Sequence, residues 1–256
     1  MCIRDRLTPY LYIPKRKGSL QIEMAVTARR FDMLPYPLQP KLAYVLAEIA
    51  AGNPVLVLQN LRFQWWPQWH YAVVVGYDMD SSTLALRSGT TKRWLTSFKN
   101  FERTWNRADN WALVVVPAGY IPATADATIY LKTAYAFEQT GLNQAALEAY
   151  RAATGTWPDH TATWLSLGNL AYQSGLTEEA VDALLTASSL EPDNAIVWNN
   201  LAYALYRLGC SKQSLASLQC AHRLSPGDQN IHSSEQEIKN MPLRQPAGRC
   251  PDIACQ

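Results

Sequence analysis

This sequence has no apolar run that approaches the roughly 20 residues of a membrane-spanning helix, so we expect no membrane span in this chain. It also lacks an excess of either charge. There are 23 Lys and Arg residues against 21 Asp and Glu residues, and the basic residues form no stripe. Nucleic-acid binding requires clustered positive charge, so we expect no nucleic-acid partner.

Cysteine and histidine are scarce, at five and four residues. No two cysteines form a CxxC pair, and no histidine flanks them at the spacing of a zinc site. We therefore expect no metal site and no cofactor. Cys250 and Cys255 lie in a tail that contains proline and arginine, where they could pair or stay free. The redox compartment does not follow from this pattern.

The first six residues have neither the apolar core of a signal peptide nor the pattern of a helix or strand. They look like the translated adapter sequence found at the ends of assembled contigs. We expect residues 1–6 to be an artefact and the natural protein to extend further upstream. A location in the bacterial envelope or periplasm would follow if that upstream segment held an export signal.

Residues 7–117 combine helical patterns with short apolar runs. Helical spacing predicts helices at 19–31, ended by a Pro-containing segment at 34–37, and at 42–49, ended by Gly52. The next apolar runs predict strands at 54–59, 71–77, 84–86, 93–95 and 111–116, with a helix at 98–105. Two helices followed by hairpin-linked strands predict an α+β domain with an antiparallel sheet.

The second half of the chain repeats itself every 34 residues. Pro158, Pro192 and Pro226 keep this period. It is also kept by a larger set: Gly141, Gly175, Gly209, Tyr130, Trp164 and Trp198. Small side chains recur at the eighth and twentieth positions of each period, where two helices approach closely.

This pattern resembles the tetratricopeptide repeat, a stacked helix-turn-helix unit. The resemblance implies an all-α solenoid of three repeats at 127–228, after a linker at 118–126. A capping helix at 229–240 would cover the last repeat, and 241–256 would form a tail.

Repeat arrays of this type bind extended peptides or partner helices along the concave face of their first helices. Chaperone-binding versions clamp a carboxylate with several basic residues, whereas this face presents only Arg207. A groove of tyrosines and asparagines suits an uncharged peptide segment. The predicted peptide-binding residues are Tyr135, Asn169, Tyr172, Asn199, Tyr203, Tyr206 and Arg207.

His70 stands at the start of a predicted buried strand. A histidine held there could be a general base beside a cysteine or serine nucleophile, or a structural hydrogen bonder. The G-N-P-V segment at 52–55 and the H-Y-A-V-V-V-G-Y-D segment at 70–78 resemble bacteriocin-processing (double-glycine leader) papain-like cysteine peptidases. The resemblance covers about residues 14–117 and implies that His70 is the catalytic base of a hydrolase domain.

Two features depart from that family. Its nucleophile is a cysteine near the start of the first helix, whereas Cys2 lacks the following glycine and lies in the suspected artefact. The family orients its histidine with Asp or Asn after the next strand, and Ser88 stands at that place here. Ser88 could hold the imidazole but offers no charge to stabilise imidazolium. We therefore expect an incomplete peptidase-like domain that is inactive by itself.

Three functions are compatible with the sequence. The first is a peptide-binding repeat protein with a truncated, inactive peptidase-like domain, a domain pairing that exists in bacteria. The second is an active cysteine peptidase in the full-length parent, with repeats that recruit its substrate. The third is a non-catalytic interaction scaffold. The upstream sequence would distinguish the first two.

Several residues near His70 keep two interpretations. Gln59 and Asn60 could present amides to a cleft or cap a strand end. The tryptophans at 65, 66 and 69 could line a peptide groove or shield the sheet. If the nucleophile-bearing helix lies upstream, apolar sheet surface would be uncovered. The residues expected there are Val55, Val57, Val73 and Val75.

Overall fold

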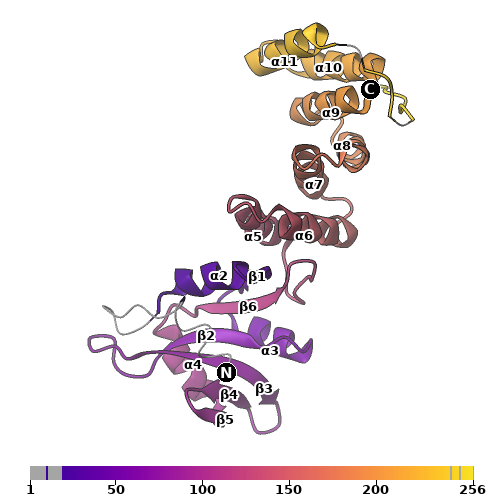
Figure 1. The fold of residues 1–256 in the computed structure, drawn as a ribbon. Coiled ribbons are helices and arrows are strands. Elements are labelled where there is room, and N and C mark those ends of the chain that lie inside the picture. The colour runs from indigo at the N-terminus through magenta and orange to yellow at the C-terminus, as the bar shows by residue number, and fades with distance from the viewer. Residues whose placement is uncertain (1–9, 11–18, 243, 248, 256) are drawn as a thin grey trace. The chain divides into compact units, whose positions relative to one another are not determined.

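The computed structural model describes residues 10, 19–242, 244–247 and 249–255, which form two compact units, 1–137 and 138–256 (Figure 1). Residues 1–6, which include Cys2 and the expected artefact, lie outside the described part of the chain. No helix of the described part is long and apolar enough to cross a membrane.

The first unit is built on an antiparallel sheet with the strand order β1-β6-β2-β3-β4-β5 among the described residues (Figure 1). This agrees with the α+β class predicted from the sequence. The strands are β1 (Met33–Pro37), β2 (Val55–Asn60), β3 (Trp69–Asp78), β4 (Thr83–Ser88), β5 (Thr91–Ser97) and β6 (Ala112–Pro117). The helices are α2 (Gln21–Arg29), α3 (Leu42–Ala50), α4 (Phe98–Asn106) and α5 (Ala127–Glu138).

One face of the sheet forms the core. Val55 and Val57 of β2 are fully buried, although the sequence predicted that both would be uncovered. They share a face with Gln59, whose amide donates to Thr104 of α4 at 2.7 Å, so α4 covers this face. The expectation was wrong for these two valines because α4 supplies the cover that we had assigned to an upstream helix.

The opposite face of the sheet is less covered. Val55 pairs with Val74, which places Val73 and Val75 on the other side. Val73 is half-buried, and the side chain of Val75 is 37% exposed. Of the four valines, only the two on this second face are therefore partly exposed.

Strand β1 was not predicted from the sequence. Pro35 and Pro37 suggested only the end of a helix, but the segment pairs in register with β6. β1 lies at the edge of the sheet, where a proline without an N–H group leaves no ladder hydrogen bond unmade on its open side. Its position at the edge explains how two prolines fit within five strand residues.

The segment 118–126, predicted as a linker, lies inside the first unit. The side chain of Glu48 on α3 is fully buried and is its main anchor. Its carboxyl oxygens accept hydrogen bonds from the backbone N–H and Oγ1 of Thr124, at 2.7 and 2.6 Å. They also accept from Nδ2 of Asn53 at 2.7 Å. One buried acidic side chain therefore joins this segment to the α3–β2 turn.

The second unit is helical up to Asn240, and the described residues of its tail have no regular secondary structure. Its helices are α6 (Asn143–Thr156), α7 (Thr161–Gln173), α8 (Thr177–Leu190), α9 (Ala195–Leu208), α10 (Ser211–Leu224) and α11 (Gln229–Asn240). Each packs against the next one along the chain (Figure 1). Helices α7 and α9 begin at Thr161 and Ala195, one and two 34-residue periods after the predicted start of the repeats at 127.

The 34-residue period has a hydrogen-bond basis. Trp164 Nε1 donates to the carbonyl of Pro158 at 2.7 Å. The same bond recurs one period later, from Trp198 to the carbonyl of Pro192 at 2.8 Å. The repeated prolines and tryptophans thus fix α7 and α9 to the turns before them. The repeated glycines Gly175 and Gly209 follow α7 and α9 with φ values of 79° and 90°, which glycine adopts without strain.

The tail is fixed to the end of the stack. Cys250 pairs with Cys210, and Cys255 pairs with Cys220 on α10. The sequence left open whether the two tail cysteines would pair, and they pair with the last helices. The backbone N–H of Ala247 also donates to the carbonyl of Leu208 at 2.8 Å. The tail is therefore part of the second unit's structure.

Candidate functional site

His70 and Ser88 lie together in the first unit. His70 is the second residue of β3, and Ser88 is the last residue of the neighbouring strand β4. His70 Nε2 is 2.7 Å from Ser88 Oγ. Ser88 is buried, and burial lowers the pKa of the half-buried His70 imidazole. The imidazole is therefore oriented by a hydroxyl group and favours its neutral form.

The other nitrogen of this imidazole, Nδ1, has no hydrogen-bond partner among the described residues. It is the atom that a substrate or nucleophile could meet. The described residues of the first unit include no cysteine, because Cys2 lies outside them. The described part of this site thus contains a histidine and the serine hydroxyl that it contacts.

Gln59 and Asn60 make internal contacts. Gln59 donates to Thr104, as described above, and is buried. Oδ1 of Asn60 accepts from the backbone N–H groups of Arg62 and Gln68, at 3.1 and 2.9 Å. Of the two interpretations from the sequence, a structural role therefore applies to both amides. They stabilise the loop after β2 and its contact with α4.

The loop between β2 and β3 carries exposed aromatic side chains. Trp65 is 79% exposed, and its ring stacks on Phe63 with centroids 5.6 Å apart. Trp66 in the same loop and Trp69, the first residue of β3, are also more than half exposed. These rings face solvent and do not shield the sheet, which removes one of the two interpretations that the sequence allowed.

A cavity of about 310 Å³ lies in the second unit. It gathers residues from α7, α8 and α9, including three of the predicted peptide-binding residues. Its lining consists of Asn169, Tyr172, Gln173, Leu184, Asn200 and Tyr203. The cavity is therefore lined mainly by amide and phenol groups.

The polar groups of this cavity are connected. Asn200 Nδ2 donates to Asn169 Oδ1 at 2.9 Å. The rings of Tyr172 and Tyr203 meet edge to face, with centroids 6.4 Å apart. The hydroxyl of Tyr203 donates to Glu237 of α11 at 2.7 Å, and burial is the main cause that raises the pKa of Tyr203. These contacts fix the positions of the lining side chains.

Asn200 was missed by the sequence analysis, which chose its neighbour Asn199. The helix face had been assigned by counting along the repeat, and a shift of one residue turns the side chain by about 100° around the helix axis. Asn199 donates to Asn200 at 3.5 Å and does not line this cavity. The signal that could have found Asn200 is its position 31 residues after Asn169, close to one repeat.

Arg207 is engaged within the protein. Its guanidinium lies 3.6 Å above the ring centroid of Tyr172 and donates to the Tyr172 carbonyl. A stacked, hydrogen-bonded guanidinium is a cation–π contact that fixes both side chains. Arg207 therefore supports the wall of the cavity and is not placed as a carboxylate clamp.

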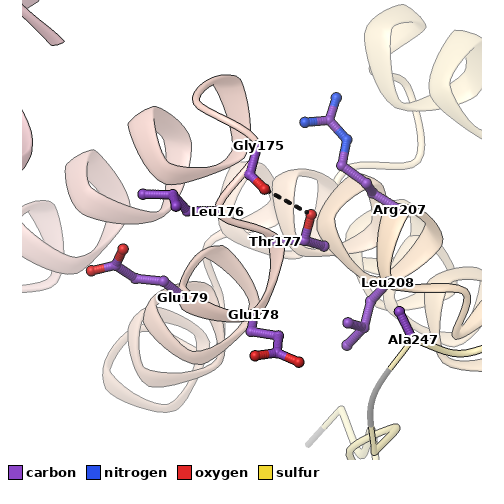
Figure 2. Close-up of a pocket in the computed structure, with 8 residues that line it drawn as sticks. All are labelled: Gly175, Leu176, Thr177, Glu178, Glu179, Arg207, Leu208 and Ala247. Atoms are coloured by element: carbon purple, nitrogen blue, oxygen red, sulfur yellow. Dashed lines mark hydrogen bonds between the residues drawn. The ribbon is translucent and has the colours of Figure 1, made fainter. Parts of the chain in front are cut away.

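Arg207 also reaches a second cavity, of about 430 Å³, at the turn between α7 and α8 (Figure 2). The tail contributes Ala247 to its lining. The remaining lining residues are Gly175, Leu176, Thr177, Glu178, Glu179 and Leu208. Glu179 is already bound by Arg151 through two contacts of 2.7 Å.

Two further predicted residues lie elsewhere. Tyr206 is buried, with 6% of its surface exposed, and its hydroxyl donates to the carbonyl of Pro242 at 2.6 Å. The tail covers it, so the prediction that Tyr206 faces a groove was wrong. Tyr135 is half exposed on α5, which belongs to the first unit apart from its last residue.

Comparisons with known proteins agree with the repeat pattern. Residues 131–188 match the family described as tetratricopeptide repeat, and residues 168–209 match one described as TPR repeat. No curated protein matches the chain.

Several solved structures are similar to part of the chain. One described as MamA MSR-1 C2 is 24% identical, with 46% of this chain and 68% of that chain covered and a TM-score of 0.42. MamA 41-end from Desulfovibrio magneticus RS-1 is 17% identical, with 44% and 64% covered and a TM-score of 0.42. The first TPR of Spaghetti (RPAP3), bound to an HSP90 peptide, is 12% identical, with 44% and 90% covered and a TM-score of 0.42.

The family matches, the helix pairs and the recurring bond from tryptophan to the proline carbonyl lead to one conclusion. Stacked helical repeats of this kind form extended surfaces that bind other chains. The helical part of this protein is a tetratricopeptide-repeat solenoid, a scaffold for protein binding.

Proposed function

We propose that this protein binds an uncharged, extended peptide segment in the cavity between α7 and α9. The observation that carries the proposal is the linked set of Asn169, Tyr172, Asn200 and Tyr203 around a space of about 310 Å³. Asparagine side chains can both donate to and accept from a peptide backbone. Tyrosine rings add contact area at a low cost in side-chain entropy.

The six lining residues carry no charge, and the charged side chains that contact them favour an uncharged ligand. The guanidinium of Arg207 already stacks on Tyr172, so it is engaged before a ligand binds. Glu237 accepts from Tyr203 at the side of the cavity and would repel a carboxylate. A C-terminal carboxylate is therefore a poorer ligand here than an internal segment.

A random peptide library selected on the full chain tests this proposal. Peptides that bind should be enriched in uncharged residues, and their affinity can be measured by calorimetry. Asn169→Ala and Asn200→Ala should each weaken binding about tenfold, which corresponds to about 1.4 kcal/mol. Gln219→Ala, an exposed change on α10, is the matched control. Equal affinities in all four proteins would contradict the proposed site.

The first unit supports a narrower proposal, a papain-like, peptidase-related domain that is inactive in this chain. The support is the contact of 2.7 Å between His70 and Ser88, the pair that the family resemblance selects. A general base alone cannot form an acyl-enzyme, because a nucleophile must attack the peptide carbonyl.

Incubation of the purified chain with a Gly-Gly-containing peptide tests this inactivity. We expect no hydrolysis above that of the His70→Ala variant. Hydrolysis that His70→Ala abolishes would contradict the proposal, and its loss in Cys2→Ala would identify Cys2 as the nucleophile. In that case the alternative function, a cysteine peptidase whose repeats recruit substrate, would replace it.

The two disulfides favour an oxidising compartment, such as the bacterial periplasm, as the place where this protein works. Reducing compartments keep most cysteine pairs as thiols. The protein can be expressed in the periplasm and in the cytoplasm, alkylated, and analysed by mass spectrometry. The four cysteines should escape alkylation, because they are in disulfides, only in the periplasmic sample. If those thiols were free in the periplasmic sample, the proposed location would lose its support.

A further inference from the structure

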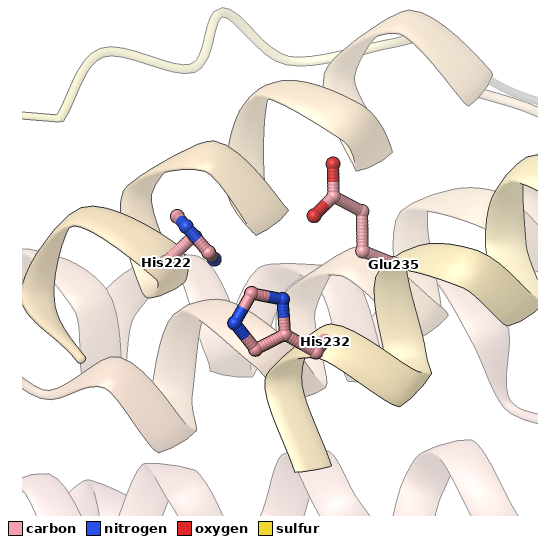
Figure 3. Close-up of side chains that lie close together, drawn as sticks. All are labelled: His222, His232 and Glu235. Atoms are coloured by element: carbon pink, nitrogen blue, oxygen red, sulfur yellow. The ribbon is translucent and has the colours of Figure 1, made fainter. Parts of the chain in front are cut away.

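We propose that His222, His232 and Glu235 form a binding site for a divalent metal ion of the zinc type at the junction of α10 and α11. A ligand atom of each residue lies within 4.8 Å of one from each of the other two (Figure 3). The two imidazole rings meet edge to face, with centroids 4.6 Å apart. The ligand atoms of a tetrahedral zinc site are roughly 3.3 Å apart, a spacing that side-chain rotation could reach from here.

The backbone places the three residues without strain. His222 lies in the last turn of α10, and His232 and Glu235 lie on α11. Residues three apart on a helix share a face, so His232 and Glu235 point the same way. Figure 3 shows the three side chains directed into one space between the helices. All three are half-buried, which leaves an ion access from solvent.

One hydrogen bond shows which ring nitrogen of His232 is the donor. Its Nε2 is 3.0 Å from the carbonyl oxygen of Pro226. A carbonyl oxygen can only accept, so Nε2 is the donor in this bond, and Nδ1 is the nitrogen whose lone pair a metal ion would take. Metal-binding histidines commonly donate their other N–H to a carbonyl in this way.

This bond is the third copy of the bond that anchors α7 and α9 to the turns before them. His232 stands 34 residues after Trp198, and Pro226 stands 34 residues after Pro192. A tryptophan at this position has one N–H group and no acceptor. Histidine makes the same anchoring bond and still has a nitrogen to offer. A histidine at the position where the earlier repeats have tryptophan therefore adds a metal ligand and keeps the hydrogen bond of the repeat.

The other two residues have unused ligand atoms. Nδ1 of His222 is buried and has no hydrogen-bond partner among the described residues. A buried polar atom without a partner costs free energy, which a bound ion would recover. Oε1 of Glu235 accepts from Lys239 at 2.6 Å, and its second oxygen has no partner within the described part of the chain.

The donor set determines the class of ion. Two imidazoles and one carboxylate suit zinc and the neighbouring late first-row metals, and they suit calcium and magnesium poorly. Three protein ligands leave a position for water or a fourth ligand. The nearby cysteine Cys220 is bound in a disulfide with Cys255 and supplies no thiolate.

Zinc titration against a chromophoric chelator tests the site, with oxidised, tag-free full chain. We expect one equivalent bound with micromolar or tighter affinity. His222→Ala and His232→Ala should each weaken binding at least tenfold, and the isosteric Glu235→Gln should also weaken it. His70→Ala and His160→Ala remove the other two histidines and should leave binding unchanged.

Thermal unfolding gives a second measurement that does not depend on the chelator. Zinc should raise the Tm of the wild type and leave that of a double variant, His222→Ala with His232→Ala, unchanged. Circular dichroism without metal checks that the variants fold. Absence of stoichiometric binding by the wild type, or equal binding by the double variant, would overturn the proposal and leave the two rings as a packing pair.

Discussion

In the second unit each helix packs against its neighbours in sequence, whereas the first unit joins distant parts of the chain. Pairing of β1 with β6 brings Met33 beside Pro117, and buried Glu48 holds Thr124. The repeats instead reuse one bond, from Trp164 to Pro158 and from Trp198 to Pro192. Short-range contacts can form independently along a stack, but long-range contacts require the whole domain.

The two units also differ in the links that hold distant parts of their chains together. The second unit carries two disulfides that tie the tail to its last helices, and the described residues of the first unit carry none. The first unit depends on buried polar side chains such as Glu48 for the same purpose. Perturbing one kind of link should therefore destabilise one unit and spare the other.

The largest effect should come from reduction of the disulfides. Loss of a native disulfide commonly costs about 2–5 kcal/mol of stability, and both bonds here close loops of moderate length. Hydrogen exchange of the backbone amides can be measured at increasing urea concentrations. It should show a strong loss of protection from exchange in α9, α10 and α11 when reductant is present. Exchange in β2 and β3 serves as the internal control and should not change.

Glu48→Ala should produce the opposite pattern. The change leaves the backbone N–H of Thr124 and the side chain of Asn53 without their acceptor, at a cost of about 3 kcal/mol to the first unit. Protection of β1, β2 and β6 should fall, while α7 to α10 keep theirs. Glu102→Ala, an exposed change on α4, should have little effect. Equal destabilisation by both variants would mean that the buried contacts of Glu48 contribute nothing.

A glycine pair tests the close packing of the repeats. A Cβ atom on Gly168 would lie 2.6 Å from Cγ of Leu184, so Gly168→Leu should overpack the α7–α8 contact and cost about 1–3 kcal/mol. Gly155 of α6 has open space around it, and Gly155→Ala should stabilise the unit by about 0.5 kcal/mol. Chemical denaturation of both variants checks the signs. Similar changes in the free energy of unfolding for Gly168→Leu and Gly155→Ala would show that packing around Gly168 is loose.

The smallest effect is the pH dependence from His70. Burial lowers its pKa in the folded state, so the unfolded chain binds a proton more readily. Stability should therefore decline as pH falls below about 6.5, the unfolded pKa, and this loss should be absent above about pH 7. NMR titration of His70 and acid unfolding of His70→Gln check this. A folded pKa above 6.5 would reverse the predicted slope.

The sequence predicts the second unit better than the first for a physical reason. A repeated bond leaves a repeated residue pattern, so the starts of α7 and α9 follow from the positions of proline and tryptophan. Edge strand β1 leaves no such pattern, because its prolines resemble a helix end. The contacts of Glu48 join residues with no periodic relation and could not be read from the sequence.

The candidate sites show the same division. The contact between His70 and Ser88 followed from a family pattern, and Tyr172 and Tyr203 followed from the repeat alignment. The burial of Tyr206 could not be predicted, because it depends on disulfides that fold the tail back. The catalytic and peptide-binding roles of these residues stay predictions.

Site-specific photo-crosslinking tests the central claim, that the cavity between α7 and α9 receives the peptide, most directly. A photo-reactive amino acid is placed at Gln173, an exposed residue that lines the cavity, and separately at Gln219 on α10 and at Phe63 in the aromatic loop. A peptide selected on the full chain should crosslink strongly from position 173 and weakly from the other two. Strong crosslinking from position 63 with none from 173 would contradict the account.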